Sequence, residues 1–204
     1  MTRALACFVV LFALAAAAPA AAELSAAAIA RALQHGGYVI VMRHASSPMT
    51  PPDAADADAG NTGRERQLDA AGKASATAMG AAIRRLHLKI GRVWSSPTYR
   101  ALETARLAGL PTPTAAPELG DRGRSMSAAS DDQSTWLRAK AGERPARGAD
   151  DVLITHMPNI VAAFGDAAKG ISDGEALIFQ PGRKGQAELV ARVPMSEWPE
   201  LAGR

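Results

Sequence analysis

The sequence predicts an α/β fold, a three-layer α/β/α sandwich in which helices cover both faces of a mostly parallel central sheet. Short runs rich in β-branched residues alternate with longer segments of helical periodicity, which is typical of this class. The run at 38–42 is apolar throughout, which indicates a strand that is buried on both faces. A chain of 204 residues has room for one such domain.

The N-terminal segment has the features of a secretory signal peptide. Arg3 precedes an apolar run from Leu5 to Ala18 that is too short to span a bilayer comfortably, and small residues at 19–22 supply a cleavage site. We therefore expect cleavage after Ala22, a single domain over 23–204, and a periplasmic or secreted protein without stable membrane insertion. An uncleaved anchor is the alternative.

Composition disfavours two classes of site. The only cysteine, Cys7, lies in the predicted signal, so we expect no disulfide and no thiolate metal site in the mature chain. The formal net charge is only +3, no dense run of lysine and arginine occurs, and aromatic residues make up 4% of the chain. Such a chain lacks the basic, aromatic surface that nucleic-acid binding needs. The sequence leaves the oligomeric state open.

The first half of the chain divides into alternating elements. Helical spacing predicts a helix over 24–34 that two glycines end. The strand over 38–42 follows, and then a loop over 48–66 that is rich in proline, glycine and aspartate; a loop of this length is more often functional or mobile than idle. The pattern next predicts a helix over 68–88 and a strand over 90–94.

The second half begins with a helix that extends to about residue 108. We expect Ser96 to be its N-cap and Pro97 to occupy its first position, where each residue type is favoured. Residues 111–130 look irregular, with a short strand near Ala115. The remaining segments are, in order, a helix over 132–141, a strand over 151–155, a helix over 158–168, and strands over 176–180 and 188–193.

Polar residues stand where three of the predicted strands end. Arg43 and His44 follow the first strand, the second leads into the helix that carries Arg100, and His156 follows the third. Because ligands bind at the carboxyl ends of strands in open α/β sheets, we expect these side chains to share one edge. Arginine forks match tetrahedral oxyanions, and a helix N-terminus adds N–H donors. The sequence therefore predicts a phosphate site with a histidine nucleophile.

Four motifs, in chain order, resemble the histidine phosphatase superfamily, whose founding members are the cofactor-dependent phosphoglycerate mutases. The resemblance covers about residues 38–160 and rests on VMRHASS, RQLDAAGKASATAMGAAI, SSPTYRALETA and ITHMPNI. It implies that His44 is the phosphorylated nucleophile and that Arg43 and Arg100 bind the phosphoryl oxygens. It also implies that His156 is the second histidine of the pocket and donates to the phosphoryl group.

The resemblance leaves the general acid open. Family members often carry a glutamate in an L-x-E pattern, and Asp121 occupies that place in this chain, with Glu118 as the competitor. A carboxyl group there would protonate the leaving oxygen. The family's usual Arg-His-Gly triplet reads Arg-His-Ala here, with Ala45 in the third place, a variation that the family also contains.

The resemblance implies an enzyme, a histidine acid-type phosphatase that hydrolyses phosphoric monoesters through a phosphohistidine on His44 and needs no cofactor. Together with the predicted signal peptide, it favours a small phosphorylated substrate such as a phosphosugar of the cell envelope. Two alternatives stay open: a phosphohistidine-protein phosphatase, and a non-catalytic module that binds phosphate or a phosphosugar. A metal site at His44 and His156 is disfavoured, because no metal-ligand spacing occurs and the flanking arginines repel cations.

Overall fold

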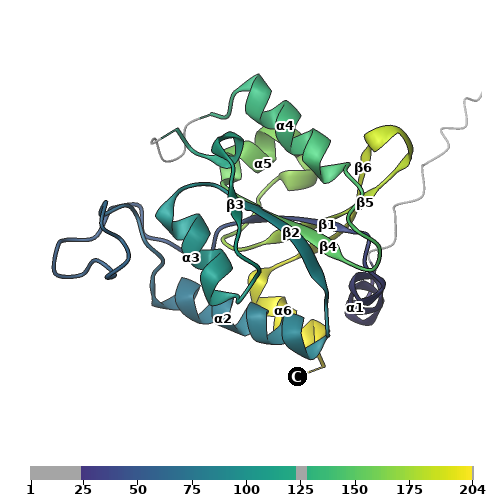
Figure 1. Cartoon of the computed structure of the whole chain (residues 1–204), viewed down its shortest axis with the longest axis horizontal. Coiled ribbons are helices and arrows are strands. Elements are labelled where there is room, and N and C mark those ends of the chain that lie inside the picture. The colour runs from purple at the N-terminus through teal and green to yellow at the C-terminus, as the bar shows by residue number, and fades with distance from the viewer. Residues whose placement is uncertain (1–23, 123–127, 204) are drawn as a thin grey trace, which may run out of the picture.

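A computed structural model of the chain contains a six-stranded mixed sheet with helices on both faces (Figure 1). It describes residues 24–122 and 128–203, so the predicted signal peptide lies outside the described residues. This arrangement confirms the predicted α/β class. The strands are β1 (Val39–Arg43), β2 (Ile90–Ser95), β3 (Thr114–Ala115), β4 (Asp150–Thr155), β5 (Ala176–Pro181) and β6 (Ala187–Val193).

The strand order is β3-β2-β4-β1-β5-β6. Strands β1 to β4 pair in parallel, whereas β5 is antiparallel to both of its neighbours. The two central strands, β4 and β1, are buried over almost their whole length, which explains the continuous apolar sequence of β1 from Val39 to Met42. Because β1, β2 and β4 point the same way, the residues that follow them meet at one edge of the sheet.

The side chains of β1 alternate between two hydrophobic cores. Ile40 and Met42 pack in one core with residues of four helices, while Val39 and Val41 pack in the other with residues of two helices. The first core holds α1 (Ala26–His35), α2 (Ala70–Arg85), α3 (Tyr99–Leu107) and α6 (Trp198–Leu201), and the second holds α4 (Asp131–Ala141) and α5 (Met157–Phe164). Within the described ranges, no helix has both the length and the apolar character needed to cross a membrane.

Two predicted helix boundaries were wrong. Helix α3 begins at Tyr99 with Thr98 as N-cap, because the N–H of Ser96 donates to the carbonyl of Ile154 and so extends the pairing of β2 with β4. The helix expected over 158–168 ends at Phe164, after which the chain turns through Gly165 at φ +54° into a short 3-10 segment.

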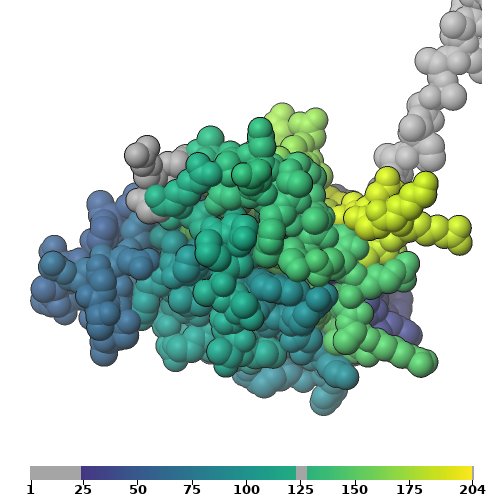
Figure 2. Space-filling view, turned by 45° about the horizontal axis from the view of Figure 1, so that its top comes forward, coloured from purple at the N-terminus to yellow at the C-terminus, as the bar shows by residue number. Residues whose placement is uncertain are grey.

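The loop over 48–66 is folded by its own polar side chains. Asn61 is 3% exposed, and its amide donates to a backbone carbonyl of the loop and accepts from a backbone N–H. Gln67 donates to the carbonyl of Asp56 at 2.7 Å and accepts from the N–H of Asp58 at 2.9 Å. The loop, shown in blue, projects beyond the helices and strands in both views (Figures 1 and 2). These contacts define its conformation although it contains no helix or strand.

Candidate active site

The strand register brings three functional segments together. Arg43 is the register partner of Thr155, and Ser95 is that of Ile154. Beyond these pairs, the N–H of His44 still donates to the carbonyl of Thr155 at 3.0 Å. The residues that follow β1, β2 and β4 therefore lie side by side at the carboxyl edge of the sheet, as the sequence predicted.

His44 is buried, with 3% of its surface exposed, and both of its ring nitrogens have partners. Nδ1 lies 2.8 Å from the carbonyl oxygen of Ala45, and Nε of Arg100 donates to Nε2 at 3.1 Å. Since a guanidinium nitrogen only donates, Nε2 carries the lone pair and Nδ1 carries the proton. The N–H of Ala45 donates to the hydroxyl of Thr104, which ties this segment to α3. His44 thus presents the unprotonated nitrogen that a nucleophile needs.

Arg100 is the centre of the cluster. It is 3% exposed, lies in the first turn of α3, and donates through Nε to His44 and through Nη2 to Nδ1 of His156 at 3.1 Å. Nη2 also forms an ion pair with Oδ2 of Asp121 at 2.5 Å. The rings of His44 and His156 stand edge to face with their centroids 5.2 Å apart. One guanidinium therefore joins both histidines and a carboxylate in a buried network.

Ser96 positions His156. Because Arg100 donates to Nδ1, the proton of the neutral imidazole sits on Nε2, which donates to the hydroxyl oxygen of Ser96 at 2.8 Å. Sequence reasoning missed this contact and treated Ser96 as a helix cap. Ser96 directly follows a strand, as His44 and His156 do, and this position could have identified it as a residue of the site.

The RQLDAAG segment lies directly behind His44. The hydroxyl of Ser46 donates to Asp69 at 2.6 Å, and Asp69 caps α2 by accepting from the N–H of Gly72. A Cβ atom at Gly72 would lie 2.2 Å from the carbonyl oxygen of Ser46. Glycine is therefore required there, because α2 begins in contact with the backbone that follows β1.

Arg43 faces the loop that precedes β5. Its Nη2 forms an ion pair with Oδ1 of Asp173 at 2.6 Å, and its Nη1 donates to the carbonyl of Ile171 at 3.4 Å. Asp173 is half-exposed, and the sequence did not single it out. The cluster therefore contains two arginine–carboxylate pairs, Arg43 with Asp173 and Arg100 with Asp121.

The two candidate acids lie in different surroundings. Asp121 is 8% exposed and belongs to the cluster through Arg100, while hydrogen bonds from Gln133 and Asn159 to the carbonyl of Gly120 hold its backbone. Glu118 is half-buried, and in the described part of the chain its carboxylate makes no hydrogen bond to this cluster. Of the two carboxylates, the structure brings that of Asp121 to the histidines.

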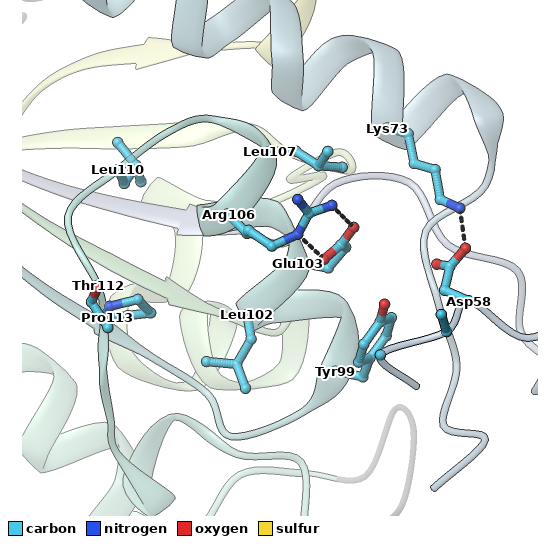
Figure 3. A pocket seen from close by; sticks show the side chains of 12 residues that line it. Asp58, Lys73, Tyr99, Leu102, Glu103, Arg106, Leu107, Leu110, Thr112 and Pro113 are labelled. Atoms are coloured by element: carbon cyan, nitrogen blue, oxygen red, sulfur yellow. Dashed lines mark hydrogen bonds and ion pairs between the residues drawn. The ribbon is translucent and has the colours of Figure 1, made fainter. Parts of the chain in front are cut away.

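A groove of about 740 Å³ leads from the surface to Arg100 and Asp121. Arg66 also lines it, together with proline and methionine side chains. A larger hollow of about 820 Å³ lies on the outer face of α3, where two ion pairs, Asp58–Lys73 and Glu103–Arg106, face it (Figure 3). The groove lining comprises Met49, Pro51, Glu65, Arg66, Pro97, Thr98, Arg100, Pro117, Gly120, Asp121 and Arg122.

The surroundings of both histidines favour the neutral imidazole. Burial, followed by the proximity of His156 and the two arginines, holds the pKa of His44 well below its ordinary value of 6.5. Burial and the charge of Arg100 lower the pKa of His156 to about 3, although Asp121 acts in the opposite direction. Both rings are therefore neutral at physiological pH, as a nucleophile requires. In the described ranges, no three His, Cys, Asp or Glu side chains are grouped as a metal ion would need.

We expect NMR to show the neutral state of His44 and His156, since the chain has only four histidines whose signals must be assigned. The ring nitrogen resonances of His44 and His156 should stay those of neutral tautomers between about pH 7.5 and 5.5. The unfolded chain takes up these protons near pH 6.5, so the free energy of unfolding should fall as the pH drops below about 6.5. His44→Gln and His156→Gln assign the signals. Protonation of either ring above pH 6 would contradict the expectation.

Known proteins share the sequence pattern and the fold of this chain. Residues 39–148, more than half of the chain, match the sequence model of the histidine phosphatase superfamily (branch 1). The protein histidine phosphatase SixA, solved with tungstate, is similar with a TM-score of 0.58 and 19% identity over 78% of this chain and 98% of its own. No protein with a curated description matches the sequence.

Two further solved structures share the fold. A putative phosphohistidine phosphatase SixA from Agrobacterium tumefaciens is 17% identical, with a TM-score of 0.53 over 78% of this chain and 98% of its own. A phosphoserine phosphatase variant from Entamoeba histolytica, in complex with phosphoserine, is 11% identical, with a TM-score of 0.51 over 78% of this chain and 97% of its own. At these identities the likeness concerns the fold alone.

Proposed function

The chain belongs to the histidine phosphatase superfamily, and from this premise we propose that it hydrolyses phosphoryl groups through a phosphohistidine on His44. One observation carries the proposal: a buried histidine with an unprotonated Nε2 lies beside a second neutral histidine and a guanidinium. A nucleophile of this kind divides one difficult hydrolysis into two easier steps.

In the first step, the lone pair of Nε2 attacks phosphorus, and the bond from phosphorus to the leaving atom breaks. Arg43 and Arg100 bind the phosphoryl oxygens, whose charge spreads during the transfer. A hydrogen bond from His156 to the same group requires its Nε2–H to leave the hydroxyl of Ser96. In the second step, water attacks the phosphohistidine, the P–N bond breaks, and inorganic phosphate leaves. His44 then regains its starting tautomer, with Nδ1–H directed to the carbonyl of Ala45.

The ion pair of Asp121 bears on the choice of substrate. An alkoxide must be protonated as it leaves, but the carboxylate of the candidate acid, Asp121, is engaged in an ion pair with Arg100. A phosphorylated imidazole leaves as a neutral ring once solvent has protonated its second nitrogen, which occurs near neutral pH. This geometry therefore favours a P–N bond over the P–O bond of an alkyl ester.

The favoured substrate in our proposal is a phosphohistidine side chain of another protein. Two SixA proteins, named as phosphohistidine or protein histidine phosphatases, support it by sharing the fold along 98% of their length. The open groove above Arg100 supports it further, because a side chain presented by a protein needs such access. The phosphomonoester favoured at first from the sequence becomes the second candidate.

A side-by-side assay tests the proposal. The full chain is incubated with a chemically phosphorylated histidine peptide and, separately, with glycerol phosphate, and released phosphate is measured. We expect kcat/KM to be at least about 100-fold higher for the peptide, a difference of about 3 kcal/mol in transition-state stabilisation. Faster hydrolysis of glycerol phosphate would overturn the choice of substrate. No phosphate release from either compound would overturn the proposal that the protein is a phosphatase.

A phosphosugar of the cell envelope is the second candidate, because the sequence before Glu23 has the features of an export signal. Export would place the protein in the periplasm or outside the cell, away from phosphohistidine proteins of the cytoplasm. Mass spectrometry of the protein from its native host decides this point. A mature N-terminus at Glu23 favours the envelope substrate, whereas an intact N-terminus in the cytoplasmic fraction removes its support.

A further inference from the structure

Arg66 lies at the end of the loop over 48–66, just before helix α2. It is 8% exposed and lines the same groove as Arg100 and Asp121. It is also the first residue of the RQLDAAG segment. In this segment Asp69 caps α2 and Gly72 allows close contact with Ser46, whereas the function of the arginine has not yet been assigned. A nearly buried arginine in the groove above the histidines therefore needs an explanation.

Two backbone carbonyls orient the guanidinium of Arg66. Nε donates to the oxygen of Pro48 at 2.5 Å, and Nη2 donates to the oxygen of Ser47 at 3.1 Å. These contacts join the two ends of the loop, which a neutral amide would do as well. Asn61 in the same loop joins backbone groups in this way without any charge. Unlike an amide, a guanidinium at this position also acts on the charges around it.

The charge of Arg66 acts on the catalytic cluster. Burial and then the neighbouring Arg100 lower the pKa of its guanidinium, and Arg43 adds to this, while Asp121 and Asp173 oppose it. The charge of Arg66 also lowers the pKa of His156. Even so, the guanidinium stays charged at every physiological pH. Three guanidinium groups thus repel one another around two carboxylates, and a bound dianion would relieve this repulsion.

We propose that Arg66 is a third phosphate-binding arginine, which holds the phosphoryl group from the side of the groove. This inference rests on the proposed function and extends it, because it assigns a ligand contact to a residue outside the Arg43, His44, Arg100 and His156 set. The carbonyls of Ser47 and Pro48 hold the fork in place, so little side-chain entropy is lost on binding. The same contact serves the substrate and the inorganic phosphate that is released.

Inorganic phosphate is the probe that tests this role, since it binds without turnover. By calorimetry on the full chain, we expect Arg66→Gln to raise the Kd for phosphate at least about tenfold, as the loss of a charge-assisted hydrogen bond should. Arg66→Lys keeps the charge without the fork and should fall between Arg66→Gln and wild type. Gln67→Ala is the matched control, because it removes side-chain contacts of the same loop without changing its charge.

The control should bind phosphate within about twofold of wild type. Equal losses in Arg66→Gln and Gln67→Ala, or no loss in Arg66→Gln, would overturn the inference. A measurement on the wild-type chain decides the question even if Arg66→Gln does not fold. The Nε–Hε NMR signal of Arg66 should shift during phosphate titration, whereas that of Arg106, in the hollow on the other side of α3, should not. An unmoved Arg66 signal would contradict the proposed contact.

Failure of this inference differs from failure of the proposed function. If wild type neither binds phosphate nor hydrolyses either substrate, both are wrong. If wild type binds phosphate and Arg100→Gln weakens that binding, while Arg66→Gln leaves it unchanged, the phosphatase proposal stands and only the role of Arg66 is wrong.

Discussion

Replacing His44 with alanine is expected to lower kcat by at least about 10³-fold with any phosphorylated substrate, because the variant lacks the atom that accepts the phosphoryl group. The side chain is buried, and its Nε2 lies 3.1 Å from Nε of Arg100, one of the groups that bind the phosphoryl oxygens. Released phosphate measures the rate. The phosphoenzyme, trapped by an alkaline quench and located by mass spectrometry, measures the intermediate.

Binding must be separated from chemistry in this variant. His44→Ala should still bind inorganic phosphate, since Arg43 and Arg100 remain, and calorimetry provides this control. His44→Gln is the second variant, because it retains polar contacts in the buried site. Phosphate release at the wild-type rate by either variant, or a phosphorylated residue other than His44, would refute the mechanism. Unimpaired phosphate binding by a wild type without turnover would favour the binding-module alternative.

Replacing Arg100 with alanine is expected to have the largest combined effect on activity and stability. The change removes the donor to both histidines, which should lower kcat by about 10²- to 10³-fold. It also removes the buried ion pair of Arg100 with Asp121, a loss worth about 3 to 5 kcal/mol of unfolding free energy. Urea unfolding and steady-state kinetics measure the two effects separately.

Arg106 supplies the matched control on the same helix. Its ion pair with Glu103 joins an arginine side chain that is 68% exposed to a glutamate side chain that is 8% exposed. Because the glutamate is buried, Arg106→Ala is expected to lower stability as well, but it should leave activity unchanged, since Arg106 lies outside the cluster of histidines. Arg100→Ala and Asp121→Asn combined should recover part of the lost stability, because the buried charge is then gone. If Arg100→Ala unfolds at the same urea concentration as wild type, the buried pair does not have this role.

The fold class was predictable because burial on both faces leaves a clear mark in sequence. The run at 38–42 is apolar throughout, and the structure places β1 in the middle of the sheet with a core on each side. The boundary of α3 was not predictable in this way. Ser96 and Pro97 are good residues for a helix start, but the hydrogen bond from Ser96 to Ile154 joins positions that lie far apart in the chain.

The residues of the candidate site also fall into a group that the sequence predicted and a group that it did not. Arg43, His44, Arg100 and His156 each stand at or just after a strand end, and the rule for parallel sheets brings such residues together. Asp173 and Arg66 reach the same cluster from loops, whose course depends on side-chain contacts rather than on periodicity. Arg66 opens the RQLDAAG motif, but no sequence pattern assigned it a contact with the cluster, and none singled out Asp173.

By itself, the sequence determined the α/β class, the family, and the two arginines and two histidines at one edge of the sheet. It could do so because periodicity and strand ends are local properties. Only the tertiary structure decided the protonated nitrogen of each histidine, the pairing of Asp121 with Arg100 and the approach of Arg66. These properties depend on distances of about 3 Å between residues far apart in the chain. At that range, small differences in loop conformation decide which atoms meet.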